Sequence, residues 1–100
     1  MATYSASQVK TITLVSGQVD TITLAGSGST LRVSTDSTSV PVSFTVAQPG
    51  GTPATPTDAG DNCYVVMSAY DSFDLPWTGN GCVIKVIATG TPIVSFALIG

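Results

Sequence analysis

The chain has 100 residues, 43% of them hydrophobic, and a formal net charge of −3 from six acidic and three basic residues. Histidine is absent and every acidic residue is aspartate, so the imidazole of zinc sites and of most acid–base catalysis is missing. Binding of phosphate backbones requires clustered Lys and Arg, whereas Lys10, Arg32 and Lys85 are scattered. We therefore expect one domain that is not an enzyme and has no catalytic residues, metal, cofactor or nucleic-acid partner.

Targeting signals are also missing from the sequence. No apolar run approaches the ~20 residues that cross a bilayer, and the first residues lack the basic start and apolar stretch of an export signal. We expect synthesis in the cytoplasm and no membrane partner.

Residues 1–8 are polar, and we expect them to form a flexible N-terminal arm ahead of a folded domain at residues 9–100. The arm, which carries Tyr4, is the first candidate for contact with another protein, because an extended segment can add a strand to a neighbour. Simple disorder is the alternative.

The first half of the domain shows the two-residue period of half-buried strands. Ile12 and Leu14 alternate with threonines, and Thr21 to Leu24 repeats the pattern after a turn, which predicts a hairpin. Leu31 and Val33 are expected to face inward on either side of Arg32. The next strand places its apolar side chains on one face, and the proline within it indicates a sheet edge or the start of the strand: Val40, Pro41, Val42, Phe44, Val46.

Residues 48–60 contain three prolines and three glycines and predict a long exposed loop, the second candidate for a contact. Strands are expected at residues 63–69, 82–89 and 93–99, with a short strand and a turn within residues 70–77. Seven or eight short strands at this spacing predict an all-β fold, a single antiparallel β-sandwich or small jelly roll.

Cys63 shares its parity with Val65 and Met67, and Cys82 with Ile84 and Val86, so both thiols are expected to point inward. Two interpretations stay open, a disulfide between Cys63 and Cys82 or two buried free thiols. A cysteine nucleophile is not expected, because no histidine is present to activate it.

Two groups of aspartates are candidates for chemical sites. Asp58 and Asp61, with Asn62, offer oxygen ligands for Ca²⁺, but the spacing of a dedicated calcium loop is missing. Asp71 and Asp74 resemble a carboxylate pair for glycoside hydrolysis, yet aspartates also initiate turns. We favour the turn interpretation.

Tyr70, Phe73 and Trp77 form an aromatic segment with three interpretations. The aromatic rings stack on sugars, or they form a protein interface, or Phe73 and Leu75 fill the end of the sandwich while Trp77 covers it. The candidate interface residues are thus Tyr4, Tyr70, Phe73 and Trp77.

Five segments follow one another along the chain: Val19–Leu24, Arg32–Val33, Val42–Val46, Asn62–Val66 and Val83–Pro92. Their order resembles that in the small all-β virion proteins of tailed bacteriophages of actinobacteria. The resemblance implies a structural role without catalytic residues. An acidic domain is repelled by packaged DNA, which favours the capsid exterior over the lumen.

We therefore expect a capsid decoration or minor capsid protein on the outside of the virion, with the major capsid protein as its partner. Self-association into a symmetric homo-oligomer such as a trimer is also expected. The alternatives are a host-surface or glycan-binding β-sandwich module, which would use Tyr70 and Trp77, and a structural protein of the tail.

Overall fold

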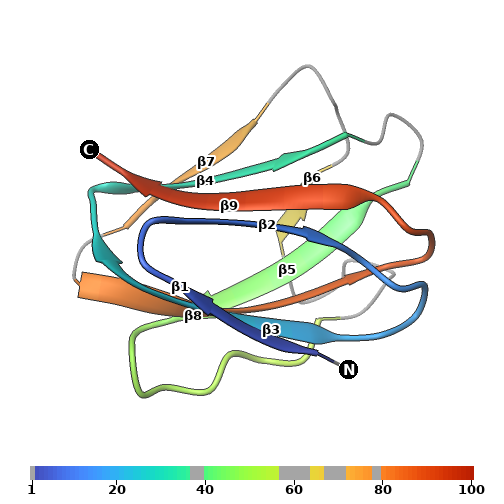
Figure 1. Cartoon of the computed structure of the whole chain (residues 1–100), viewed down its shortest axis with the longest axis horizontal. Coiled ribbons are helices and arrows are strands. Elements are labelled where there is room, and N and C mark those ends of the chain that lie inside the picture. Colours follow the sequence, from blue (N-terminus) through green and yellow to red (C-terminus); the bar gives the residue numbers. More distant parts are fainter. Residues whose placement is uncertain (1, 37–39, 57–63, 67–71, 78–79) are drawn as a thin grey trace.

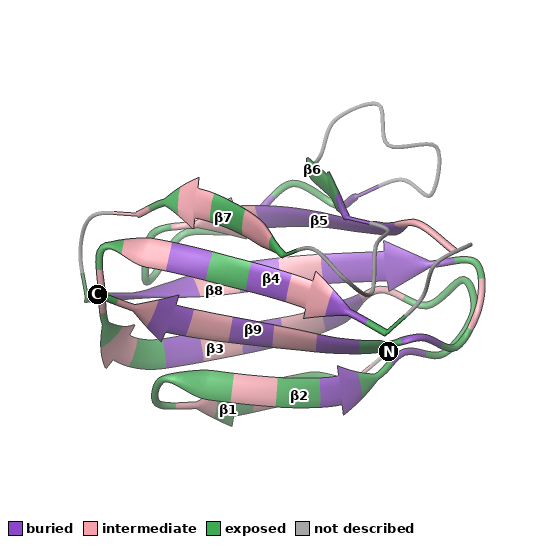
Figure 2. Ribbon diagram, turned by 90° about the horizontal axis from the view of Figure 1, so that it is seen from above, coloured by how far each residue is buried: buried purple, intermediate pink, exposed green. Residues whose placement is uncertain are grey.

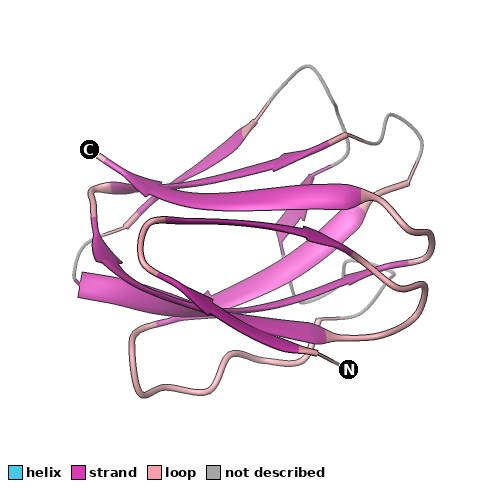
Figure 3. Cartoon of the chain, in the orientation of Figure 1, coloured by secondary structure: helices cyan, strands magenta, loops and turns pink. Residues whose placement is uncertain are grey.

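The computed structural model describes residues 2–36, 40–56, 64–66, 72–77 and 80–100. Regular structure in these ranges consists of strands (Figure 3), and no helix among them is long and apolar enough to cross a membrane. The described strands are β1 (Thr3–Ala6), β2 (Val9–Thr13), β3 (Asp20–Ser27), β4 (Thr30–Thr35), β5 (Val42–Ala47), β6 (Tyr64–Val66), β7 (Phe73–Pro76), β8 (Asn80–Ala88) and β9 (Ile93–Ile99). The all-β prediction is confirmed, with nine strands where seven or eight were expected.

The strands form two sheets that face each other (Figure 1), a five-stranded sheet in the order β1-β3-β8-β5-β6 and a four-stranded sheet in the order β2-β9-β4-β7. Four antiparallel pairs are nested in the sequence, β2 with β9, β3 with β8, β4 with β7 and β5 with β6. This is one long antiparallel hairpin rolled into two layers, which is the eight-stranded jelly roll. The additional strand β1 pairs in parallel with β3.

The predicted hairpin between residues 11–14 and 21–24 is wrong. β2 lies in the four-stranded sheet and β3 in the five-stranded sheet, and the chain between them crosses from one layer to the other. In that connection Leu14 N donates to Pro92 O (3.0 Å) and Gly17 N to Ala88 O (2.9 Å). Because β2 and β3 each have one apolar face, placing them in opposite layers buries both faces against a common core.

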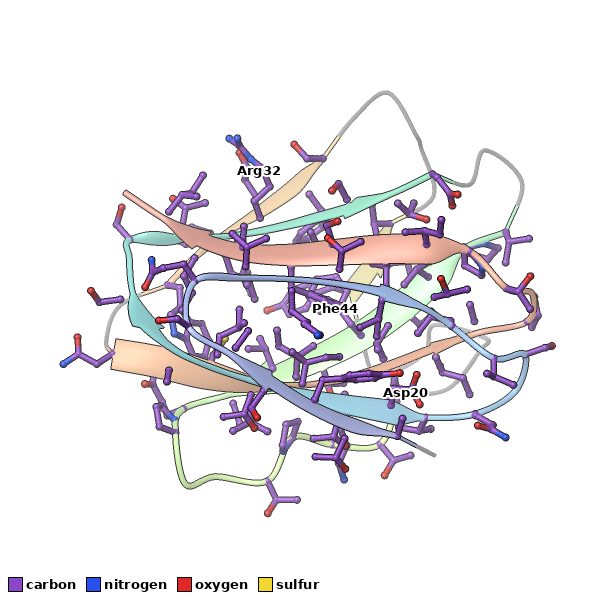
Figure 4. All side chains as sticks on the ribbon, in the orientation of Figure 1. Asp20, Arg32 and Phe44 are labelled. Carbon is purple, nitrogen blue, oxygen red and sulfur yellow. The ribbon has the colours of Figure 1, made fainter. Side chains whose placement is uncertain are left out.

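We expected residues 1–8 to form a flexible arm. Residues 3–6 instead form β1, at the edge of the chain's own sheet. Asp20 holds the start of this strand, since its Oδ1 accepts a hydrogen bond from Ala2 N at 2.9 Å. Figure 4 shows Asp20 close to the first residues of the chain. The segment therefore pairs within the molecule instead of extending toward a neighbour.

The core lies between the sheets and receives apolar side chains from both. Phe44 and Phe96, one from each sheet, meet edge to face with ring centroids 6.2 Å apart. The strands alternate as predicted for residues 12, 14, 22, 24, 31 and 33. The fully buried large side chains are Leu14, Ile22, Leu24, Leu31, Val33, Val42, Phe44, Ile84, Val86, Val94, Phe96 and Leu98.

Residues 48–56, the described part of the loop predicted at residues 48–60, form a loop that is exposed at all positions but two, and part of it covers the five-stranded sheet. Pro53 and Pro56 are buried, and the Thr45 hydroxyl donates to Ala54 O. Ser43 and Thr45, on the outward face of β5, are buried as a result. In Figure 1 the loop runs along the outer side of this sheet. The covered face also carries Ile87 of β8, so the loop shields apolar surface that the sheet alone would expose.

Candidate functional site

The β6–β7 edge consists of the last strand of each sheet, Tyr64–Val66 and Phe73–Pro76. It lies on the side of the molecule opposite β1 and β2 (Figure 2). Both strands are short, and among the described strands each pairs on one side only, β6 with β5 and β7 with β4. Tyr64 and Val65 of β6 are each 42% exposed. A strand edge without a described neighbour can pair with another chain, and exposed apolar side chains on it make this edge a candidate contact surface.

The predicted parity of the strand at residues 63–69 is wrong in its described part. Val66 pairs with Val42 and is buried, whereas Val65 pairs with Ser43 and faces away from the core. The register follows from β5, because Tyr64 stands opposite Phe44 and the two side chains share the inward face. The inward orientation expected for Cys63 and Val65 is therefore wrong for Val65.

An aromatic cluster fixes the shape of this edge. Tyr64 lies 5.5 Å from Phe44 and 5.4 Å from Phe73, measured between ring centroids. Phe73 meets Phe44 edge to face at 5.7 Å, at an interplanar angle of 85°. Such pairs stabilise a structure by about 0.5–1.5 kcal/mol beyond the area they bury. The cluster ties β6 of one sheet to β7 of the other, so the exposed part of Tyr64 rests on a rigid base.

The predicted interface residues do not form one aromatic site. Phe73 and Trp77 are partly buried against the core, Phe73 in the cluster and Trp77 just beyond the other end of β7. Trp77 Nε1 donates to Gly81 O (2.9 Å), and Trp77 N donates to Ser29 O (3.0 Å). These contacts match the interpretation in which the segment fills and covers the end of the sandwich.

Tyr4 lies at the opposite edge, on β1, with Lys10 Nζ 5.4 Å from the centre of its ring. Tyr70 lies outside the described residues. Tyr64 and Val65 were not singled out from the sequence. The missing information was which strands lie at the edges, since neither residue belongs to a recognisable motif.

Each described aspartate has a structural partner. Asp20 accepts from Ala2 N, and Asp36 Oδ1 accepts from Ile93 N at 2.9 Å. Asp74 receives two hydrogen bonds from Arg32, at 2.8 Å from Nε and 3.0 Å from Nη2. Hydrogen bonding by Arg32 lowers the pKa of Asp74, and the same bond raises the pKa of Arg32.

The other acidic candidates, Asp58, Asp61 and Asp71, and Asn62 lie outside the described residues. Within the described ranges, no three His, Cys, Asp or Glu side chains gather to hold a metal ion. The partner that the sequence suggested for Asp74 was Asp71, whereas the structure pairs Asp74 with a cation on the adjacent strand.

Cys82 is fully buried and carries a free thiol, and burial raises its pKa to about 11. A thiol in this state behaves as a small apolar side chain. Cys63 lies outside the described residues, and the free thiol at Cys82 matches the second of the two interpretations, a buried free thiol, and not a disulfide.

Comparison of the chain with protein-family models, with curated proteins and with solved structures finds no match.

Proposed function

We propose that the protein is a non-enzymatic structural component of a bacteriophage virion, a decoration or minor capsid protein that binds the major capsid protein on the outer surface of the head. The proposal rests on the resemblance of its strand segments to small virion proteins of actinobacteriophages and on its net charge of −3. The jelly roll is compatible with this role, because it occurs in viral capsid proteins, but it also occurs in lectins.

One observation favours binding over catalysis: the described acidic side chains are engaged in structural hydrogen bonds, whereas large apolar side chains are exposed. The described aspartates hold strands and turns in place, whereas Tyr64 and Val65 at the β6–β7 edge are large apolar side chains left in contact with solvent. We therefore assign the capsid contact to the β6–β7 edge. Interface cores are enriched in aromatic side chains, and Tyr64 supplies an exposed one at this edge.

The test is a titration of the purified protein against expanded heads that lack it, with bound copies counted per particle. We expect saturation at a number allowed by the symmetry of the head, and heads that rupture at a higher temperature after binding, because a ligand of the assembled state stabilises that state. Binding should change little between low and high salt, since few charges are available for screening. Absence of saturable binding would contradict the proposal.

Two matched variants test the assigned surface. Val65→Asp places a charge on the β6–β7 edge, and Val15→Asp makes the same change at another valine, which is 51% exposed in the connection between β2 and β3. We expect Val65→Asp to weaken binding to heads at least 10-fold and Val15→Asp to leave it unchanged. Equal effects of the two variants would remove this edge from the proposal.

The glycan-binding alternative is supported by the exposed face of Tyr64 and by the occurrence of jelly rolls in lectins. Trp77 is poorly suited to stack on a sugar, because its ring is partly buried and its Nε1 is engaged by Gly81 O. Competition separates the two functions: free sugars displace a lectin from its target and leave a decoration protein bound to heads. Displacement by a sugar would shift the assignment to the glycan-binding module.

A further inference from the structure

Asp20 is the one buried carboxylate among the described residues. It is 2% exposed, whereas Asp36 and Asp74 are exposed. As the first residue of β3 it shares the inward parity of Ile22 and Leu24, which belong to the core. Ionised carboxylates are rarely buried unless a cation or several hydrogen bonds compensate for the loss of water. A positive partner would therefore stabilise the protein at this point.

No basic side chain supplies that partner. All three basic residues of the chain lie in the described ranges, and none of them forms an ion pair with Asp20. Arg32 is paired with Asp74, and the Lys10 ammonium lies over an aromatic ring. Lys85 alternates with the buried residues of β8 and belongs to its outward face. The partner must then be sought on the backbone.

The atom that faces the carboxylate is the backbone nitrogen of Ala2, which donates to Asp20 Oδ1 at 2.9 Å (Figure 4). The carbonyl oxygen of the same residue accepts from Thr21 N, also at 2.9 Å. Ala2 is thus held at both ends of its backbone, directly ahead of the pairing of Thr3 with Thr21. Because the sheet fixes the nitrogen against the carboxylate, a cation at this atom would need no rearrangement.

The charge on this nitrogen depends on whether the chain is cut ahead of it. As a peptide N–H, Ala2 N gives Asp20 one hydrogen bond and no charge. As a free α-amino group it is an ammonium, because most α-amino groups are protonated at pH 7 and a nearby carboxylate favours the charged form. A hydrogen bond between two ions is roughly twice as strong as one between neutral groups.

We propose that the peptide bond between Met1 and Ala2 is hydrolysed during synthesis, and that the α-ammonium group of Ala2 then forms a buried ion pair with Asp20. Water supplies the atoms, since the carbonyl carbon of Met1 gains an oxygen and leaves as a carboxylate while the Ala2 nitrogen becomes an ammonium. Peptidases that remove methionine act ahead of small side chains, and the side chain of Ala2 is a methyl group. Cleavage has to precede folding, because both backbone ends of Ala2 are engaged in the folded chain. The inference does not depend on the virion role.

The first test is the intact mass of the chain, produced in bacteria with Met1 as its first residue. We expect the mass of the chain without Met1 and with a free amino group at Ala2. A product that retains Met1, or one that is acylated at Ala2, would overturn the proposal.

The second test compares two forms of the folded chain, prepared by cutting a removable fusion partner either ahead of Met1 or ahead of Ala2. The form that keeps Met1 retains the N–H of Ala2 without its charge and is therefore the matched control. Urea unfolding should give a folding equilibrium constant at least 10-fold larger for the form that begins at Ala2. Equal constants would contradict the ion pair, whichever mass is found in the first test.

Two variants then assign this difference to the carboxylate. Asp20→Asn keeps an oxygen acceptor for Ala2 N and removes the negative charge, so the two forms should become equally stable. Asp36→Asn is the control, because the exposed Asp36 also accepts a backbone hydrogen bond, from Ile93 N, and we expect the difference to persist in it. A difference that survives Asp20→Asn would overturn the proposal.

A further measurement needs no variant and therefore holds even where Asp20→Asn fails to fold. The α-amino group of Ala2 should be acylated by an amine-reactive reagent at least 10-fold more slowly in the folded chain than in urea, because Asp20 keeps it protonated and engaged. Similar rates in the two states would contradict the ion pair.

Discussion

Gln8 holds Ser27 through both ends of its side-chain amide, since Gln8 Nε2 donates to Ser27 O and Ser27 N donates to Gln8 Oε1, both at 2.9 Å. The same Nε2 donates to Leu98 O at 3.0 Å, and Leu98 N donates to Gln8 O at 2.8 Å. Gln8 stands where the chain leaves β1 in one sheet and enters β2 in the other. One residue thus joins β3 and β9 of opposite sheets at the point where the first strand changes layer.

Gln8→Ala should lower the free energy of unfolding by about 1–2 kcal/mol, because three hydrogen bonds are lost at a partly hydrated position. Urea unfolding followed by the fluorescence of Trp77 measures the change. Gly26→Ala should also destabilise the protein, since an added Cβ would overlap the side-chain amide of Gln8 and approach Ser7 O at 2.6 Å. The double variant should lose less than the sum of the single losses. Strict additivity would show that Gly26 and Gln8 do not interact.

Gly81→Ala should destabilise the protein by more than about 1 kcal/mol, for two reasons. Gly81 has a φ of 89°, and its added Cβ would overlap Leu24 O on the neighbouring strand. Gly50→Ala is the matched control, because Gly50 has a φ of 83° but no atom within 4 Å of the added Cβ. The excess loss in Gly81→Ala over Gly50→Ala reports the collision alone, and thermal unfolding of both variants measures it.

Stability should fall between about pH 9 and pH 11 in a manner that depends on Cys82. Burial raises the pKa of this thiol from 9.0 to about 11, so the unfolded chain loses its proton first as the pH rises. The stabilisation is therefore complete below pH 9 and is lost as the pH passes through 11. The wild type should lose up to about 2 kcal/mol more than Cys82→Ala over this range. Urea unfolding at several pH values provides the comparison, and identical slopes would contradict the assignment.

Lys10→Val should increase aggregation with little loss of stability. Lys10 belongs to the edge strand β2 and points inward over Tyr4, and an inward charge on an edge strand hinders pairing with another chain. Light scattering during incubation at high concentration detects the change. Lys10→Arg keeps the charge and should behave as the wild type. Aggregation of Lys10→Arg to the same extent would assign the protection to another feature.

Strand periodicity identified the fold class because each strand has one apolar face, as the alternation around Ile12, Ile22 and Val33 shows. It could not show which strands pair. Val65 was assigned to the core from local parity, but its orientation is set by pairing with Ser43, a contact between residues far apart in sequence. The packing of residues 48–56 against the sheet could not be predicted for a similar reason. The burial of Pro53 and Pro56 depends on contact with the outward face of β5, which is not evident from the composition of the loop.

The candidate site was predictable only in its composition. Phe73 and Trp77 were recognised as aromatic residues of interest. That Phe73 lies in the aromatic cluster while Trp77 covers the end of the sandwich follows from the pairing of β7 with β4. Tyr64 and Val65 became candidates only when β6 was found at the edge of its sheet.

The nested strand pairs also set the order in which the protein can form during synthesis. β2 finds its partner in β9, which begins at Ile93, and β3 finds its partner in β8. Nearly the whole chain must therefore leave the ribosome before either sheet can form completely. Until then the apolar faces of the early strands remain exposed to solvent. Contacts between such distant segments make folding slow, and the interval before closure is when the chain is most exposed to association with other nascent copies.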